Sequence, residues 1–410
     1  MFARVFEFLK NLKPKYIYLV LFIFGGLEVL GLAPFFLWPI FAISNLIFFI
    51  LIDTTEEGKT KIKSSFWRGW IFGFSYFLFG LIWMGAAFLV DAEKFAWLMP
   101  FAVTLLPACL AIFYGLIAVV YNLFKNKSAF RVFWFAACYG FFEFLRGNIL
   151  SGLPWNLPNY IWNAGGIISQ SGALIGPYGV GLFTILIFTI PAIIKEEKAK
   201  YILAFGALVI GIALSYGAWR INAHKNDQNQ NLPIIAVGHA GFSQKELYET
   251  GNEVNVARKY LSLLDEPATR SANIIVWPEG TFPFFALEEP ELLYAINQKL
   301  GSRTLIFGAP RETQSETGIK YYNSIAWLRK GEGFPILLGL YDKYHLVPFG
   351  EYLPLGNILR AIGISSLVST GADFTPGANP KIMNIPDIPP ADPRVCYEVI
   401  FPNLVTTESK

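Results

Sequence analysis

Long apolar runs fill the first 220 residues of the chain, and shorter mixed segments fill the rest. A helix needs about 20 mainly apolar residues to cross the hydrocarbon core of a bilayer. Seven runs approach that length, and each predicts a membrane-spanning helix: Tyr16–Leu32, Phe35–Ile52, Trp70–Val90, Ala96–Tyr121, Phe130–Leu145, Ile175–Ile194 and Tyr201–Trp219. The first two are counted separately because Pro34 interrupts the helix between them.

Lysine and arginine gather on one side of this predicted arrangement. Fourteen lie in the N-terminal tail and in the three connections on its side: Arg4, Lys10, Lys13, Lys15, Lys59, Lys61, Lys63, Arg68, Lys125, Lys127, Arg131, Lys195, Lys198 and Lys200. The opposite short connections hold only Lys94 and Arg146. Because cytoplasmic loops carry the excess of basic residues, the N-terminus is predicted to lie in the cytoplasm. Seven spans then place residues 221–410 outside.

The second half of the chain has the pattern of an α/β domain. Two segments have helical periodicity, Gln244–Leu264 and Glu288–Leu300. Short β-branched runs between turn residues predict strands at Ile234–Val237, Asn273–Trp277, Thr304–Gly308, Ser324–Leu328 and Arg394–Tyr397. The third and fourth strands have no long helix between them, so part of the sheet is predicted to be antiparallel. Asp373–Pro393 is rich in proline and is predicted to be mostly loop.

Composition supports a division into a transmembrane domain at residues 1–220 and a polar domain at residues 221–410. Hydrophobic residues make up 54% of the chain and charged residues 15%, against about 25% charged in ordinary soluble domains. The net charge of +3 and the lack of a basic stripe exclude nucleic acid as an expected partner. Three cysteines are too few for a disulfide framework.

Three segments of the polar half combine reactive side chains with predicted strand ends. Glu279 follows the strand in Ile275–Gly280, Lys343 lies in Tyr341–Pro354, and Cys396 lies in the predicted strand Arg394–Tyr397. A thiolate is a nucleophile, and a carboxylate can take the thiol proton and return it to a leaving group. An ammonium group can stabilise the oxyanion of a tetrahedral intermediate. The three together predict acyl-transfer chemistry.

Two other constellations have competing interpretations. Cys396, His345 and Glu279 could be imagined as metal ligands, but no His/Cys pair has metal-ligand spacing, so no metal is expected. Glu143 and Arg146 lie one helical turn apart before a loop rich in aromatic residues. They predict either a local ion pair or a contact with a lipid headgroup.

These segments resemble the apolipoprotein N-acyltransferases, the membrane-anchored branch of the nitrilase superfamily. The stretches that carry the resemblance are Ala33–Pro34, Trp38–Pro39, Glu143–Gly147, Leu153–Asn156, Val276–Glu279, Lys343–Glu351 and Val395–Glu398. The resemblance implies a polytopic α-helical membrane domain joined to an extracytoplasmic nitrilase-like domain, an αββα sandwich. It also implies a location in the bacterial inner membrane, with the catalytic domain in the periplasm.

The activity implied is N-acylation of the N-terminal diacylglyceryl-cysteine of lipoproteins, without metal or organic cofactor. The acyl donor would be a phospholipid resembling phosphatidylethanolamine, and the acyl group would pass through a thioester. The resemblance makes Cys396 the nucleophile, Glu279 the general base and Lys343 the oxyanion group. Supporting residues would be Glu351, Glu398 and Tyr397; candidates that face the substrate or lipid would be Tyr248, Glu143, Arg146 and Trp155.

The chain departs from the family pattern in two places. His239-Ala240-Gly241 stands where family members have a Gln-Gly-Asn-like turn. The chain ends at Lys410, fourteen residues after Cys396, whereas family members continue with further sheet and helix. We therefore expect the nitrilase-like domain to be incomplete at its C-terminal end, and the chain by itself to be weakly active or inactive. The alternatives are a membrane-tethered amidase or nitrilase-like hydrolase, and a truncated pseudoenzyme that only binds lipid or lipoprotein.

Overall fold

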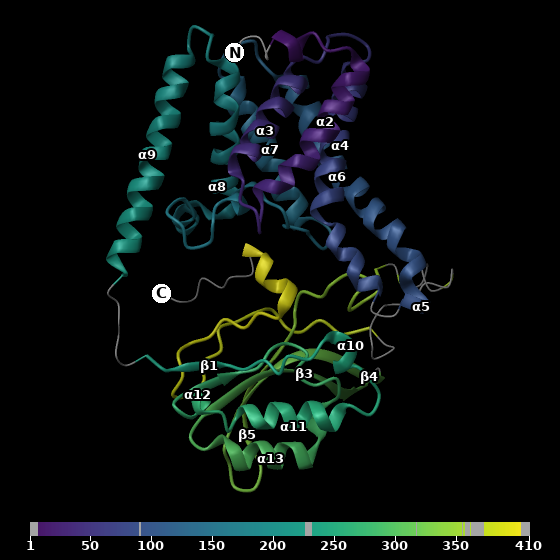
Figure 1. Ribbon diagram of the computed structural model, residues 1–410, viewed down its shortest axis with the longest axis vertical. Helices are drawn as coiled ribbons and strands as arrows, with labels where there is room; N and C mark the ends of the chain where they lie inside the picture. Colours follow the sequence, from purple (N-terminus) through teal and green to yellow (C-terminus); the bar gives the residue numbers. More distant parts are fainter. Residues whose placement is uncertain are drawn as a thin grey trace. The chain divides into compact units, whose positions relative to one another are not determined.

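The computed structural model describes residues 7–89, 92–225, 232–316, 318–354 and 373–402, together with Gly356 and Ala361. The chain divides into two compact units, Met1–Asp227 and Gln228–Lys410 (Figure 1). Each unit has its own hydrophobic core.

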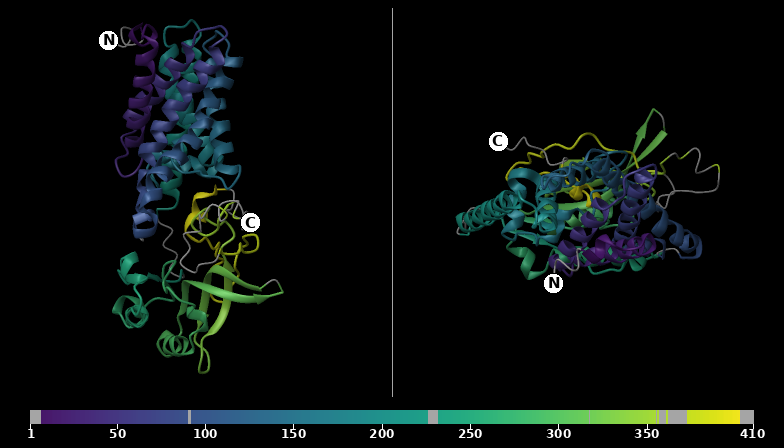
Figure 2. Two further views of the ribbon diagram at one scale, coloured as in Figure 1. Left: turned by 90° about the vertical axis from the view of Figure 1, so that its right-hand side faces the viewer. Right: turned by 90° about the horizontal axis from the view of Figure 1, so that it is seen from above.

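The N-terminal unit is helical, and its long helices run side by side in Figure 2. Its α-helices are α2 (Pro14–Glu28), α3 (Trp38–Asp53), α4 (Lys61–Gly80), α5 (Ala92–Phe95), α6 (Met99–Phe124), α7 (Arg131–Asn148), α8 (Gly172–Thr189) and α9 (Ala199–Ala223). Short 3₁₀ segments are Val29–Gly31, Ile82–Leu89, Ala96–Leu98, Pro158–Ile161, Ile168–Ser171 and Ile190–Ile193.

Helices in this unit have the length and hydropathy of membrane spans. Within the described residues four qualify: Pro14–Gly31, Ala96–Phe124, Ile168–Ile193 and Ala199–Ala223. A fifth is reached if Lys61–Gly80 and Ile82–Leu89, bent by 45°, form one span. The unit is therefore a polytopic helical membrane domain. The predicted count of seven spans and their orientation remain predictions.

Aromatic rings and small residues hold these helices together. Phe48 of α3 and Phe72 of α4 stack at a centroid distance of 4.2 Å. Gly69 of α4 lies against α6, where an added Cβ would come 2.2 Å from the main-chain oxygen of Tyr114. Small residues allow helices to approach closely in a membrane, where apolar burial alone does not favour association.

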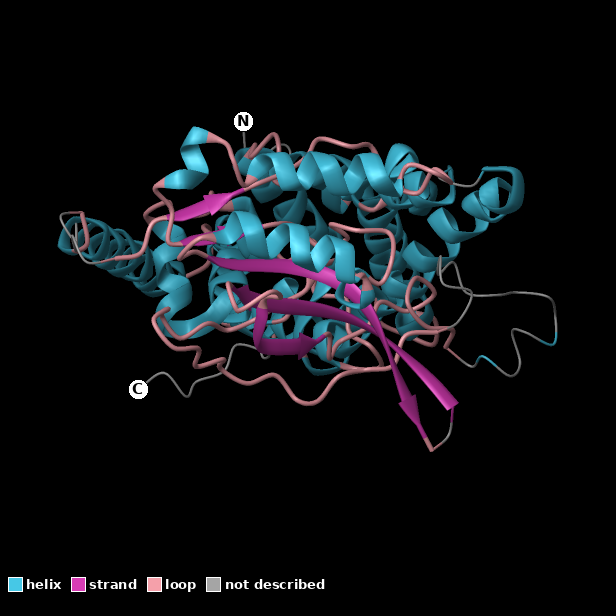
Figure 3. Ribbon diagram, turned by 90° about the horizontal axis from the view of Figure 1, so that it is seen from below, coloured by secondary structure: helices cyan, strands magenta, loops and turns pink. Residues whose placement is uncertain are grey.

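The C-terminal unit is built on a five-stranded mixed sheet in the order β1-β2-β3-β4-β5 (Figure 3). The strands are β1 (Ile235–Val237), β2 (Ile274–Val276), β3 (Thr304–Ser315), β4 (Gly318–Arg329) and β5 (Ile336–Asp342). The first three strands are parallel, and β3-β4-β5 are antiparallel, which confirms the predicted antiparallel part. The β3–β4 hairpin extends past the other strands.

Helices cover one face of this sheet. They are α10 (Gln244–Leu247), α11 (Glu253–Leu263), α12 (Pro267–Arg270) and α13 (Pro290–Leu300), with 3₁₀ segments at Ala286–Glu288 and Cys396–Ile400. Leu305 and Phe307 of β3 enter the core beneath α11 and α13, while Ile306 packs on the opposite face with Trp327. This alternation is the two-residue period of a strand with both faces covered.

The structure corrects two predictions about the polar half. Arg394–Tyr397 is not a strand, because Cys396 begins the 3₁₀ segment Cys396–Ile400 and the Glu398 carboxylate accepts the N–H of Val395 locally. The predicted helix Gln244–Leu264 is broken into α10 and α11 at Gly251, which has φ +87°. A side chain is disfavoured in that region, and glycine is tolerated there.

Candidate active site

Lys343 is placed by the end of strand β5. Its main-chain N–H donates to the carbonyl of Asn323 at 2.8 Å, and its side chain is 1% exposed. The ammonium Nζ lies 3.0 Å from Oε1 of Glu351 and 3.6 Å from Oε1 of Glu279. A buried ammonium is tolerated only where anionic or hydrogen-bonding partners replace water, and the two carboxylates provide them.

Glu279 is placed by the end of strand β2, through the buried Trp277 and through Pro278. Gly308 of β3 permits this placement, since an added Cβ would lie 2.7 Å from the Cα of Glu279. The indole of Trp277 packs against Tyr260 at a centroid distance of 5.1 Å. The backbone that carries the Glu279 carboxylate is therefore held in place by strand β3 and by the packing of Trp277.

Cys396 occupies a tight turn in which its own backbone has φ +47°. This left-handed conformation costs a non-glycine residue about 1–2 kcal/mol. Cys396 is exposed as a residue, but its sulfur is partly shielded from water and donates a hydrogen bond to Glu279. Burial of the sulfur and then the negative charge of Glu279 raise the pKa of the Cys396 thiol to about 11, while Lys343 opposes that rise. Cys396 therefore rests as a neutral thiol beside the Glu279 carboxylate.

Glu398 joins the segment of Cys396 to the segment of Lys343. Its Oε1 accepts the hydroxyl of Tyr341 at 2.8 Å and the main-chain N–H groups of Tyr344 and His345 at 2.9 and 3.0 Å. Its Oε2 accepts the N–H of Val395 at 2.8 Å. The carboxylate is 0% exposed, and four donors replace the water it has lost.

Glu351 supports Lys343 from the same loop. Its Oε1 accepts from the ammonium, and its Oε2 accepts the main-chain N–H of Val347 at 2.9 Å. The loop is thereby closed on itself between Val347 and Glu351.

Asn323 of β4 belongs to the site, although sequence reasoning did not find it. Its Nδ2 donates to Oε1 of Glu279 at 2.7 Å and to Oε1 of Glu351 at 2.9 Å. The only available signal was a polar pair, Asn323-Ser324, at the start of a predicted buried strand.

The remaining residues near the thiol are packing partners. The buried Tyr397 packs edge-on against Phe401 at a centroid distance of 4.9 Å, and the His345 ring lies 4.0 Å from that of Phe401.

Within the described part of the chain, no group of three or more His, Cys, Asp and Glu side chains could hold a metal ion. Tyr248 follows α10 and is about half exposed. Its place at the substrate stays a prediction.

In the membrane unit, Glu143 and Arg146 form a buried ion pair. Nη2 of Arg146 lies 2.5 Å from Oε2 of Glu143, and both side chains are fully buried. Another guanidinium nitrogen donates to the main-chain oxygen of Leu153, and the guanidinium lies over the Phe77 ring. Of the two interpretations of this pair, the structure shows the ion pair, which also anchors the loop that leads to Trp155.

That loop helps to line an aromatic pocket of about 490 Å³ within the membrane unit. Trp83 and Trp155 meet there edge-to-face at a centroid distance of 5.0 Å. The hydroxyl of Tyr76 donates a hydrogen bond to the main-chain oxygen of Asn156 at 2.7 Å. The other lining residues are Val29, Leu32, Ala33, Phe36, Phe79, Gly80, Tyr160, Trp162 and Ala164. Such a lining suits an apolar chain.

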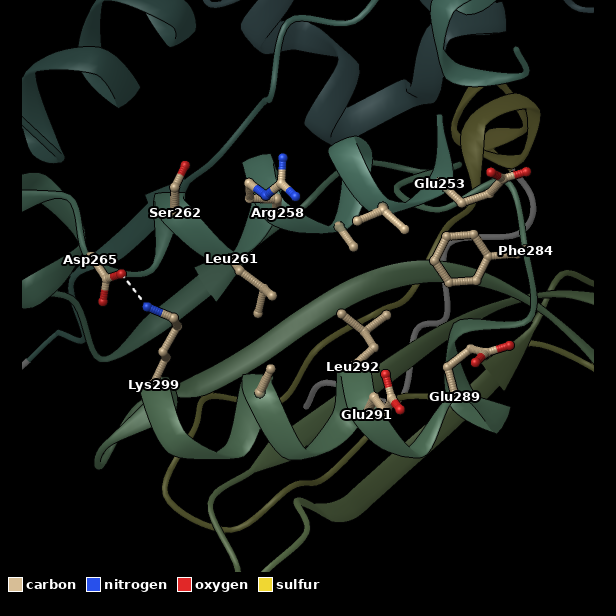
Figure 4. Close-up of a pocket in the computed structure, with 13 residues that line it drawn as sticks. Glu253, Arg258, Leu261, Ser262, Asp265, Phe284, Glu289, Glu291, Leu292 and Lys299 are labelled. Carbon is tan, nitrogen blue, oxygen red and sulfur yellow. Dashed lines mark hydrogen bonds and ion pairs between the residues drawn. The ribbon is translucent and has the colours of Figure 1, made fainter. Parts of the chain in front are cut away.

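A larger cavity of about 690 Å³ lies between α11 and α13 (Figure 4). Lys299 and Asp265 form an ion pair at one end, and Glu253, Glu289 and Glu291 lie at the other. None of Cys396, Glu279 and Lys343 lines it, so the chemistry described above is not located there.

Comparison with known proteins agrees with this geometry. The profile of the apolipoprotein N-acyltransferase N-terminal domain matches residues 24–190, and that of carbon-nitrogen hydrolase matches residues 244–410. An apolipoprotein N-acyltransferase of Caulobacter vibrioides is 36% identical over 360 residues, which cover 86% of this chain and 68% of the relative. One of Allorhizobium ampelinum is 34% identical over 394 residues, covering 92% and 73%. The chain therefore belongs to the apolipoprotein N-acyltransferase family.

Proposed function

We propose that this chain transfers an acyl group from a membrane phospholipid to the N-terminal amine of a diacylated lipoprotein, through a thioester on Cys396. The observation that carries the proposal is one cluster in which the Glu279 carboxylate accepts a hydrogen bond from the Cys396 thiol and forms an ion pair with the Lys343 ammonium at 3.6 Å. Nucleophile, base and oxyanion group are the parts that acyl transfer requires. Membership of the family supports the lipoprotein as acceptor.

In the first half-reaction, Glu279 takes the thiol proton while Sγ of Cys396 attacks the ester carbonyl of the phospholipid. The Lys343 ammonium faces the negative charge that develops on the carbonyl oxygen. When the intermediate collapses, the C–O bond breaks and Glu279 returns the proton to the leaving alkoxide. The products are a lysophospholipid and an acyl-thioester on Cys396.

In the second half-reaction, the lipoprotein amine attacks the thioester carbonyl. Glu279 accepts a proton from the nitrogen, the C–S bond breaks, and the proton passes to the departing thiolate. An amide forms and the thiol is regenerated. The thiol's pKa of about 11 favours this last protonation at neutral pH.

The membrane unit would hold the enzyme in the same bilayer as its acylated reactants. Each buried methylene holds a lipid in the bilayer by about 0.8 kcal/mol, so the ester has to react at the membrane surface. We assign the aromatic pocket around Trp83 and Trp155 to an acyl chain. The Glu143–Arg146 pair would hold the loop that forms its wall. The enzyme would lie in the inner membrane with its catalytic unit in the periplasm.

The test combines the purified chain with phosphatidylethanolamine vesicles that carry a labelled acyl chain, and with a diacylated lipopeptide. We expect a hydroxylamine-sensitive adduct on Cys396 and then a labelled amide on the peptide, each followed in a single turnover so that a weakly active chain still gives a signal. Cys396→Ala should abolish both, and Cys109→Ser, in helix α6, should change neither. Labelled free fatty acid in place of the amide would instead establish a hydrolase. Lipid binding without any adduct would leave only a binding protein.

A further inference from the structure

Asn323 lies between two carboxylates that share one ammonium. Its Nδ2 donates to Oε1 of Glu279 at 2.7 Å and to Oε1 of Glu351 at 2.9 Å. Oε1 of Glu351 also accepts from Nζ of Lys343 at 3.0 Å, and that ammonium lies 3.6 Å from Glu279. One amide group therefore uses both of its hydrogens on the acidic side chains of the site.

The backbone of Asn323 is fixed by main-chain pairing with the segments on both sides of it. It is paired with Pro310 of β3 in the hairpin, and its carbonyl accepts the main-chain N–H of Lys343 at 2.8 Å. The next residue, Ser324, donates to Asp342 at 2.7 Å, directly before Lys343. The amide is thus fixed relative to the end of β5, and it sets where Glu279 and Glu351 can lie.

The Asn323 amide supplies a neutral hydrogen-bond donor among charged groups. Glu279 is faced by the Cys396 thiol, the Lys343 ammonium and, beyond it, the Glu351 carboxylate. The two carboxylates share a single ammonium, and Asn323 gives each of them a second donor. The two N–H groups of an amide add these donors without adding charge.

We propose that Asn323 is a positioning residue that holds the Glu279 carboxylate directed at the Cys396 thiol, whose proton it takes as general base. The inference rests on the role of Glu279 in the proposed function and adds a residue to it. Asn323 touches no reacting atom, so it acts on the reaction only through Glu279 and Glu351.

Asn297 offers a matched comparison within the same unit. It is also an asparagine whose side chain makes two hydrogen bonds, donating to the carbonyl of Gly331 and accepting its N–H. Both of its partners are main-chain groups, so Asn297 supports the fold only. A substitution there controls for the loss of a buried amide as such.

The experiment measures the rate of alkylation of Cys396 by iodoacetamide at pH 7, in the full chain, by mass spectrometry of the Cys396 peptide. Asn323→Leu should slow alkylation by about tenfold, because the carboxylate that takes the thiol proton is no longer held toward the sulfur. Asn323→Asp keeps the shape but replaces the donor by a third carboxylate, and should slow alkylation at least as much.

Asn297→Leu should lower the melting temperature and leave the alkylation rate unchanged. If Asn323→Leu fails to fold, the isosteric Asn323→Asp decides the matter. An alkylation rate that stays at the wild-type value in the folded Asn323 variants would overturn the inference. Because alkylation needs neither lipid nor lipoprotein, this failure is distinct from failure of the proposed function. The latter would appear as a wild type that forms no acyl adduct.

Discussion

Oε1 of Glu398 lies 2.9 Å from the main-chain nitrogen of Tyr344, and this hydrogen bond joins segments that are 54 residues apart. Tyr344 follows Lys343, and Glu398 follows Cys396 by two positions. The segment of Lys343 and the segment of Cys396 are therefore fixed relative to each other through the Glu398 side chain. A change in Glu398 should alter the site without touching either reactive group.

Glu398→Gln tests this registration. Glutamine has one acceptor oxygen, and its amide would face N–H donors that then lack a partner. A buried unsatisfied donor costs about 1–3 kcal/mol, so we expect a lower melting temperature and slower acyl-adduct formation. Glu332→Gln, at an exposed position, is the control. Unchanged melting and unchanged adduct formation in Glu398→Gln would show that the four hydrogen bonds are dispensable.

Glu279→Gln should separate activity from thiol acidity. Acyl transfer should fall by about 10²–10⁴-fold, the usual contribution of a general base. The pKa of the Cys396 thiol, raised to about 11 by burial and by the charge of Glu279, should fall at the same time. At pH 9 the variant should therefore hold more thiolate, measured by absorbance at 240 nm, although it turns over more slowly. A thiol pKa that stays at about 11 would show that Glu279 does not influence Cys396.

Gly308→Ala should displace the base from β3. The new Cβ would lie 2.7 Å from the Cα of Glu279 and 3.0 Å from the oxygen of Pro278. Overpacking of this kind costs about 1–3 kcal/mol, and we expect at least a tenfold loss of acyl transfer in protein that still folds. Gly211→Ala, in helix α9 where no atom lies within 4 Å, should retain activity. Full activity of Gly308→Ala would mean that the Glu279 backbone can shift without consequence.

Trp155→Ala should weaken use of the lipid donor more than the chemistry itself. The pocket would lose one of its two edge-to-face rings, so the KM for phospholipid should rise. Acylation of Cys396 by a short-chain water-soluble ester should stay near the wild-type rate. Trp219→Ala, at the exposed end of α9, is the control. An equal loss with both donors would place Trp155 outside the lipid site.

The local pattern of the sequence predicted most of the elements because it depends on neighbouring residues. The apolar runs overlap the long helices of the N-terminal unit, although α4 begins nine residues before the predicted run Trp70–Val90, and four of the five predicted strands form. The predicted seven-span topology requires a bilayer to test it. Strand β5, Ile336–Asp342, was not predicted, since Gly339 and a leucine run weaken its alternation.

Within the site, the residues with reactive side chains were predictable and those that orient them were not. Glu279 and Lys343 follow strands, and parallel or adjacent strand ends meet at one edge of a sheet. Asn323 reaches both carboxylates because the β3–β4 and β4–β5 registers place it opposite that edge, and registers are set by tertiary packing. The turn at Cys396 depends on Glu398, three of whose four hydrogen-bond partners lie more than fifty residues away.

The β3–β4 hairpin carries Asn323 in its middle, while the strands continue to the Ser315–Gly318 pair at its far end. Five residue pairs of the β3–β4 ladder, from Arg311–Tyr322 to Ser315–Gly318, lie between these two points and separate the site from the tip of the hairpin. An epitope tag or a fluorophore attached at the tip should therefore leave turnover intact. The hairpin end thus offers a handle for immobilising or imaging a working enzyme.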